Sequence, residues 1–330
     1  MKTLTLERSS RWRWTNLLRS SSAGVLVAIL ILVTFLSLTT RNFVSMTNLA
    51  VLCEIVATSA IVGMAQMVIL GSGGMNLSVG SIGGLVCIIT AGLMTVFGVP
   101  TPLAILVGLV IGALCGLFNG WIITRMGVSG AVQFLVTLAS GSVFIGIVLG
   151  ITKSFPFYNL PEQFTFLGNA NIQGVPVMFF IMLLIAILVD VVFRRMKIGR
   201  QILCVGGNIK VAELTGVPVN RVVIIAHMIS GTLAGAAAIL LISRLGSADP
   251  NVGQDWLLGS FAAPIIGGTL LAGGKVSVVG AFLGAILLAL ITNGLVFLNL
   301  SVYWNTFIQG LIILGAVGLD RARMLSTQRS

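Results

Sequence analysis

The chain has 330 residues, of which 57% are apolar and only 8% are charged. Soluble globular proteins carry roughly 25% charged residues, so this composition cannot supply a water-facing surface and excludes a soluble globular protein. The formal net charge of +11 at pH 7 comes without a basic stripe of interleaved aromatic residues, which argues against a nucleic-acid partner.

Ten apolar runs are long enough to be membrane helices, because a bilayer core of about 30 Å needs roughly 20 apolar residues per helix. In chain order the predicted spans are 23–39, 48–70, 77–97, 103–124, 132–150, 175–193, 222–242, 257–272, 276–294 and 303–319. The first run follows a basic leader but has no convincing cleavage pattern, so we expect a retained helix. The predicted fold class is all-α, a polytopic membrane helix bundle of about ten transmembrane helices.

The basic residues orient this bundle. With a cytoplasmic N-terminus, sixteen of the 19 Lys and Arg fall in inside segments, and only Arg41, Lys153 and Arg244 fall outside. Positively charged loops stay on the cytoplasmic side during insertion, so this split favours cytoplasmic placement of both the N-terminus and the C-terminus. The expected organisation is a basic cytoplasmic segment 1–22, a transmembrane domain 23–319 with a cytoplasmic loop 193–221, and a cytoplasmic tail 320–330.

The densest polar cluster lies between the second and third predicted spans, in the sequence GSGGMNLSVGS at 71–81. Its glycines free the backbone from the helix, while Asn76, Ser78 and Ser81 can satisfy exposed amides or line a hydrated path. Two interpretations stay open for these residues: a re-entrant functional loop and a tight interhelical turn.

The inside segment 193–221 is the longest and most basic loop on its face. Asn208 is a suitable N-cap, and the residues after it predict about two helical turns that end at Gly216 and Pro218. A short helix along the cytoplasmic face indicates a docking point for another protein. The alternative is a solvated loop that only follows the charge rule.

The titratable residues inside the spans form no catalytic or metal-binding constellation. His227 is the only histidine and has no acid within a helical turn, so we interpret it as packed or hydrogen-bonded between helices. Asp190 has Arg194 four residues later, a spacing that favours a local ion pair. Glu54, near the outer end of the second span, stays open between a structural role and a hydrated position.

Further classes of protein are disfavoured by what the sequence lacks. It has no Walker A pattern, so hydrolysis of ATP by that route is not expected of this chain. A series of intramembrane carboxylates, as in proton-coupled carriers, is also missing. The four cysteines have no CxxC spacing and predict neither a disulfide framework nor a metal site.

Three motifs, in order, resemble the ribose/xylose/arabinose-type permease family of ABC importers. Residues 73–81, GGMNLSVGS, resemble its GGIDLSVGS signature, residues 199–217 resemble its GR…GGN…AA-x-L-x-GI loop, and residues 262–274 resemble its AA-x-x-x-GGT-x-x-x-GG segment. With Asn119-Gly120 at the end of the fourth span, the resemblance covers about 45–320. Asn76 stands where the family usually has an acid, and Pro264 interrupts the third motif, which leaves the solute open.

The resemblance implies a permease subunit that moves a monosaccharide or sugar-like solute across the bacterial plasma (inner) membrane. It implies that this chain has no cofactor, with ATP and Mg on partner ATPase subunits. The implied partners are two cytoplasmic ABC ATPase subunits, an extracytoplasmic solute-binding protein, a second permease protomer, identical or not, and membrane lipid. A branched-chain amino-acid type of ABC permease and an ion-coupled secondary carrier are the alternatives.

The residue roles that the resemblance implies fall in two groups. The ATPase-coupling loop takes Gly207, Asn208, Ala212, Glu213 and Gly216. The candidates for the translocation path are Gly74, Asn76, Ser78, Gly80, Ser81 and Asn119.

Overall fold

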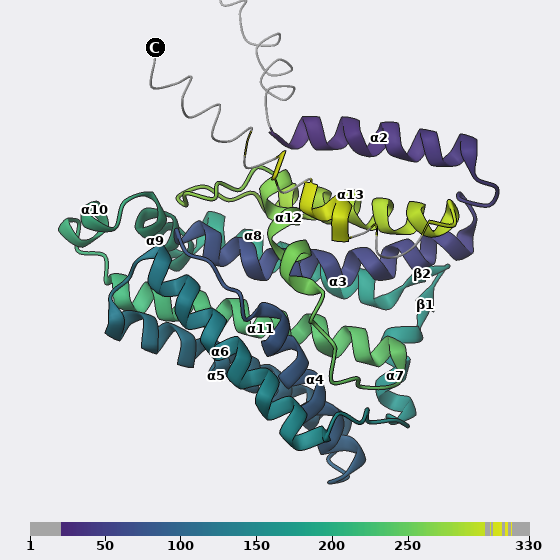
Figure 1. Ribbon diagram of the computed structural model, residues 1–330, viewed down its shortest axis with the longest axis horizontal. Helices are drawn as coiled ribbons and strands as arrows, with labels where there is room; N and C mark the ends of the chain where they lie inside the picture. Colours follow the sequence, from purple (N-terminus) through teal and green to yellow (C-terminus); the bar gives the residue numbers. More distant parts are fainter. Residues whose placement is uncertain (1–20, 301–303, 305, 312–313, 316–317, 319–330) are drawn as a thin grey trace, which may run out of the picture.

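The computed structural model describes residues 21–300, 304, 306–311, 314–315 and 318 (Figure 1). The basic N-terminal segment up to residue 20 and the tail 320–330 lie outside the described residues. The predicted tenth span, 303–319, is described only in part.

The described part of the chain is mainly helical, which confirms the all-α class. Its helices are α2 (Ser21–Thr39), α3 (Met46–Gly71), α4 (Val79–Thr95), α5 (Thr101–Met126), α6 (Gly130–Thr152), α7 (Glu162–Asn169), α8 (Val177–Arg195), α9 (Lys197–Gly207), α10 (Ile209–Leu214), α11 (Val219–Leu245), α12 (Trp256–Ile266) and α13 (Val278–Phe297). Strands β1 (Asn171–Ile172) and β2 (Val175–Pro176) form a small antiparallel hairpin between α7 and α8.

Six of the helices are long and apolar enough to cross a membrane by length and composition: α3, α5, α6, α8, α11 and α13. Helices α2, α4 and α12 have apolar stretches that are shorter than this. A multi-pass bundle is therefore confirmed. The count of ten spans and the cytoplasmic placement of both termini stay predictions.

The predicted eighth span, 257–272, is wrong at its C-terminal end, because α12 stops at Ile266. The residues that follow include Gly268, Gly273 and Gly274, all of which have positive φ angles of 77° to 90°. Only glycine adopts this region freely, so the run of glycines turns the chain away from the helix. The apolar run is therefore a short helix followed by a loop.

Two long helices are each followed by an irregular segment and then by a short helix. Residues 72–78 join α3 to α4, and residues 246–255 join α11 to α12 (Figure 1). The first turn of α4, directly after the first segment, meets the second segment inside the bundle: a Cβ atom on Gly80 would overlap the carbonyl oxygen of Gly253, and the converse holds for Gly253. Glycine at both positions permits this backbone contact.

The bundle has two distinct ends and a buried centre. Helices α9 and α10 lie at one end of its long axis, and α7 with the β1–β2 hairpin lies at the other (Figure 1). Helix α11 packs against α3, α4 and α5. Only 28% of the residues in the apolar stretch of α8 are buried, against 72% in α3, so the outer helices present apolar faces suited to lipid.

Candidate functional site

The irregular segment 72–78 is held by buried side-chain hydrogen bonds from two neighbouring helices. The Asn76 side chain donates to Ser230 Oγ on α11 (3.1 Å) and accepts from the backbone N–H (3.0 Å) and the hydroxyl (2.7 Å) of Ser78. Asn119 on α5 donates to the same hydroxyl at 2.8 Å. All four residues are buried. The segment is therefore a buried stretch among helices and not a tight interhelical turn.

Two further side chains satisfy the backbone of this segment. The Gln66 amide, in the orientation that pairs donors with acceptors, donates to the carbonyl oxygen of Asn76 at 2.9 Å and accepts from its N–H at 3.2 Å. On α6, Thr137 Oγ1 accepts from the N–H of Leu77 at 3.1 Å. An unpaired peptide group at membrane depth costs several kcal/mol, so these bonds permit a non-helical backbone here.

The isolated titratable residues lie as the sequence predicts. His227 is fully buried, with Nε2 3.3 Å from Gln133 Oε1, which confirms a hydrogen-bonded histidine between helices. Arg194 Nε donates to Asp190 Oδ1 at 2.8 Å, which confirms the local ion pair. Glu54, whose role the sequence left open, is paired with Arg244 of α11, with Nε 2.6 Å from Oε2.

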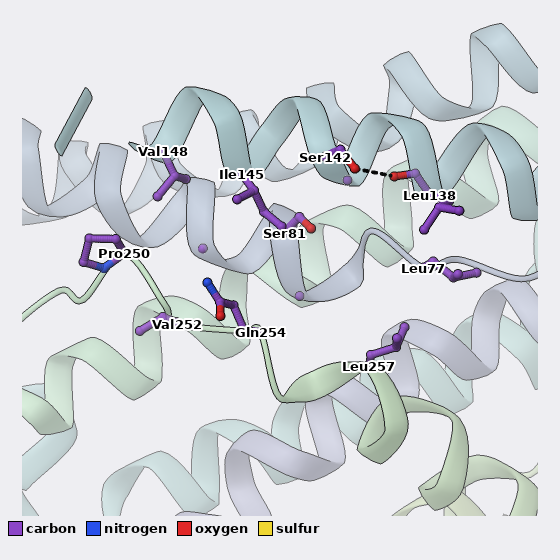
Figure 2. A pocket seen from close by; sticks show the side chains of 14 residues that line it. Leu77, Ser81, Leu138, Ser142, Ile145, Val148, Pro250, Val252, Gln254 and Leu257 are labelled. Carbon is purple, nitrogen blue, oxygen red and sulfur yellow. Dashed lines mark hydrogen bonds between the residues drawn. The ribbon is translucent and has the colours of Figure 1, made fainter. Parts of the chain in front are cut away.

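A cavity of about 390 Å³ lies where the two irregular segments approach α6 (Figure 2). Figure 2 shows its polar side chains, Ser81 on α4, Ser142 on α6 and Gln254 in the segment 246–255. The rest of its wall is glycine or apolar, and no charged residue is among the described residues that line it. Such a wall offers hydroxyl and amide groups to a neutral polar solute.

The six residues predicted for the translocation path fall into two sets. Gly80 and Ser81 line the cavity. Asn76, Ser78 and Asn119 belong to the buried network behind it, and at Gly74 a Cβ atom would overlap the Gln133 amide. The residues of the second set hold the segment 72–78 in place. A direct role in the translocation path stays a prediction for all six residues.

The segment 193–221 carries the predicted short helix, α10, with both of its predicted ends. Asn208 caps it by accepting a hydrogen bond from the N–H of Val211 at 3.1 Å. The helix ends at Leu214, and Gly216 just after it has a φ of 76° and donates its N–H to the carbonyl oxygen of Glu213 at 3.0 Å. This is the bond expected where a glycine stops a helix.

The surface of α10 shows a feature that the sequence reasoning missed. Ala212 is fully buried and anchors the helix, whereas Leu214 is 88% exposed and Val211 is 50% exposed. Glu213 and Gly207 are also exposed. Val211 and Leu214 are thus two exposed apolar side chains that lie one helical turn apart on α10.

Most of the predicted loop 193–221 is helical. It contains not only α10 but also a second helix, α9, directly before it. Gly199, Ile202 and Val205 are buried at helical spacing, so α9 has an apolar face that packs on the bundle. The helical spacing of Ile198, Ile202 and Val205 was the signal in the sequence that could have predicted it.

Helix α9 touches the start of the segment 72–78 through glycines. A Cβ atom on Gly206 would overlap the carbonyl oxygen of Gly71 and come within 2.8 Å of the backbone nitrogen of Gly274. The Gly274 N–H also donates to the Gly71 carbonyl at 3.2 Å. On Gly73 a Cβ atom would lie 3.3 Å from the Cα of Gly206. The end that carries α10 is thus in backbone contact with the irregular segment.

The chain matches a known protein family over most of its length. The family model described as branched-chain amino acid transport system / permease component matches residues 45–317. The chain is 34% identical to the ribose import permease protein RbsC of Bacillus subtilis (strain 168), over 91% of this chain and 92% of that protein.

Two further relatives have other named solutes. The D-allose transport system permease protein AlsC of Escherichia coli (strain K12) is 30% identical over 88% of this chain and 89% of that protein. The autoinducer 2 import system permease protein LsrD of Salmonella paratyphi B is 32% identical over 71% of each. No solved structure matches the chain.

Proposed function

The chain belongs to the branched-chain amino acid transport system permease family, and from its ribose and allose relatives we propose that it is the permease subunit of an ABC importer for a monosaccharide or sugar-like solute. As a multi-pass member of this family it lies in the bacterial inner membrane. It moves a solute and is not an enzyme, and ATP and Mg bind to separate ATPase subunits.

The wall of the cavity in Figure 2 favours a sugar over a branched-chain amino acid. None of its described lining residues is charged. An amino acid carries an ammonium and a carboxylate group, whose desolvation needs opposite charges or several strong hydrogen bonds. A monosaccharide needs only neutral donors and acceptors, which Ser81, Ser142 and Gln254 supply.

The exposed face of α10 is the observation that supports an ATP-driven importer. We infer that an ATPase subunit covers Leu214 and Val211, because 88% and 50% of these apolar residues are exposed beside the buried Ala212. Closure of the ATPases would press α10 and move α9 against Gly71 and the segment 72–78. A second permease protomer and an extracytoplasmic solute-binding protein complete the proposed assembly.

The test is uptake of D-ribose and D-allose into vesicles that contain the reconstituted importer. Asn208→Ala with Gly216→Ala removes the cap and strains the end of α10, and we expect ATP hydrolysis to continue while sugar uptake falls. Gly174→Ala is the matched control, because Gly174 has a φ of 88° and lies in the hairpin at the opposite end. Unchanged uptake per ATP in the double variant would refute the docking role.

The same vesicles separate the importer from an ion-coupled carrier. We expect uptake to persist after the membrane potential and the proton gradient are collapsed, and to stop without ATP. The opposite result would favour the carrier.

A further inference from the structure

A second, open cleft lies on the other side of the segment 246–255 from the cavity of Figure 2. It has a volume of about 500 Å³ and shares Val252 and Gly253 with that cavity. Arg244 places it at the α7 end of the bundle, because Gly168 of α7 packs against the backbone of Arg244. We call it the outer cleft, lined by α3, α11, the segment 249–255 and Trp256.

The outer cleft continues inward. A smaller cavity of about 160 Å³ shares Thr58, Ser59, Asp255 and Trp256 with it and extends along α3 to α13. The open part is mainly charged and polar, and hydroxyl groups line the passage into the deeper part. The two volumes adjoin at these residues and at Ile55, and together they form a recess that is polar at its opening at the α7 end.

Two of the three carboxylates in the outer cleft are already paired. Arg244 Nε lies 2.6 Å from Glu54 Oε2, with 30% and 15% of the two side chains exposed. Glu54 therefore has a structural partner and also reaches the cleft. Asp249 Oδ1 accepts hydrogen bonds from the N–H and the side-chain amide of Asn251, at 2.7 and 2.8 Å. Paired groups of this kind keep spare acceptor positions and donor hydrogens for a ligand.

Asp255 differs from these two acids. Its side chain is exposed in the cleft, and no hydrogen bond or ion pair joins it to another described residue. A single free carboxylate among paired charges does not make a cation site, and the described residues contain no group of three acids, histidines or cysteines that could hold a metal ion. Asp255 and the hydroxyl groups of Thr58 and Ser59 therefore offer free polar contacts to a ligand rich in hydroxyl groups.

Trp256 adds a flat apolar surface next to these polar groups. Its six-membered ring packs on Gly83, where a Cβ atom would come within 2.6 Å of Cζ3, and it lines both parts of the recess. A sugar ring has hydroxyl groups around its edge and an apolar face of C–H groups. An aromatic ring beside carboxylate and amide groups complements both features.

We propose that the outer cleft is a monosaccharide subsite of the permease itself. The ring of Trp256 lies against the apolar face of the sugar, Asp255 accepts hydrogen bonds from its hydroxyl groups, and Asn251 supplies further polar contacts. This inference rests on the proposed function. It means that a sugar released at the α7 end is bound by this chain before it passes the segment 246–255 into the cavity of Figure 2.

The test uses the complete importer, with its ATPase subunits and binding protein, in vesicles, with D-ribose and D-allose as probes. The measured quantity is sugar moved per ATP hydrolysed. Asp255→Asn keeps the size of the side chain, and Trp256→Leu keeps an apolar one. We expect each to lower the ratio roughly tenfold, the effect of losing one charged hydrogen bond or one aromatic contact. Trp256→Phe should restore part of it.

Matched controls have the same chemical changes away from the recess. Glu162→Gln removes an exposed acid on α7, at the same end of the bundle, and Trp121→Leu removes an exposed indole on α5. Both should leave the ratio unchanged.

Three other outcomes would contradict the proposed subsite. An unchanged ratio in Asp255→Asn and Trp256→Leu would refute it while the importer function stands. A loss confined to stimulation of the ATPase by the binding protein would assign the cleft to protein docking. A wild-type importer that moves neither sugar would refute the proposed function as well.

Discussion

Two adjacent glycines in α9 offer a matched test of how this helix joins the bundle. Alanine at either Gly206 or Gly207 gains about 0.8–1.0 kcal/mol of helix propensity. At Gly207 no atom lies within 4 Å of the added methyl group. We therefore expect Gly207→Ala to leave the stability unchanged or to raise it by up to about 1 kcal/mol.

The same change at Gly206 meets backbone atoms that cannot rotate away. The methyl group would overlap the carbonyl oxygen of Gly71 and approach the nitrogen of Gly274 to 2.8 Å. Overpacking of this kind costs about 1–3 kcal/mol, and separation of the two segments also loses the Gly274–Gly71 hydrogen bond, worth about 0.5–1.5 kcal/mol. After the gain in helix propensity, a net loss of about 1–3 kcal/mol is expected for Gly206→Ala.

Thermal unfolding of the purified permease measures this difference, and reconstituted vesicles measure sugar moved per ATP. We expect the Gly206→Ala permease to unfold at a lower temperature than the Gly207→Ala permease, because α9 no longer packs closely on the end of α3. The importer that contains the Gly206→Ala permease should move less sugar per ATP hydrolysed. If the two variants are equally stable and equally coupled, then the contact of α9 with Gly71 is not part of the route from α10 to the segment 72–78.

Two further predictions concern polar contacts, one half-buried and one buried. For Glu54→Gln and Arg244→Met we expect the free energy of unfolding to fall by about 1–3 kcal/mol each, because each single change leaves a partly shielded charge without its partner. The double variant should lose less than the sum of the two. A double-mutant cycle from thermal unfolding measures this coupling, and a value below about 0.5 kcal/mol would place the pair among ordinary surface ion pairs. Asn76→Ala leaves Ser230 and Ser78 without their buried partner, so we expect a loss of about 1–3 kcal/mol in the same assay, and an unchanged melting temperature would contradict the positioning role.

Local signals in the sequence were sufficient for the six long apolar helices and for α10. Apolar length predicts helices within lipid, and the cap at Asn208 and the stop at Gly216 act over a few residues of the same chain. The pairing of Asp190 with Arg194 is of the same kind, since one helical turn joins them. Such features need no knowledge of what packs against them.

The remaining features depend on which segments meet in space. Gly206 and Gly207 are indistinguishable in the sequence, and only the approach of Gly71 makes the first of them necessary. The partner of Glu54 is Arg244, at the far end of another helix. The sequence did contain a weak signal for the second irregular segment: the Gly-Ser and Val-Gly pairs of 71–80 recur in the same order at 246–253.

These contacts connect the two proposed sites. Helix α9 contacts the backbone of Gly71, the last residue of α3, and of Gly73 in the segment 72–78. The first turn of α4, directly after that segment, contacts the second irregular segment where Gly80 meets Gly253. At each contact a backbone lies directly on a backbone, so no flexible side chain can absorb a displacement. The segment that carries Gly253 forms a wall of both the outer cleft and the cavity of Figure 2. Under the proposed coupling, a push of the ATPase on α10 would reach the barrier between them, and for this reason we expect Gly206→Ala to reduce transport per ATP as well as stability.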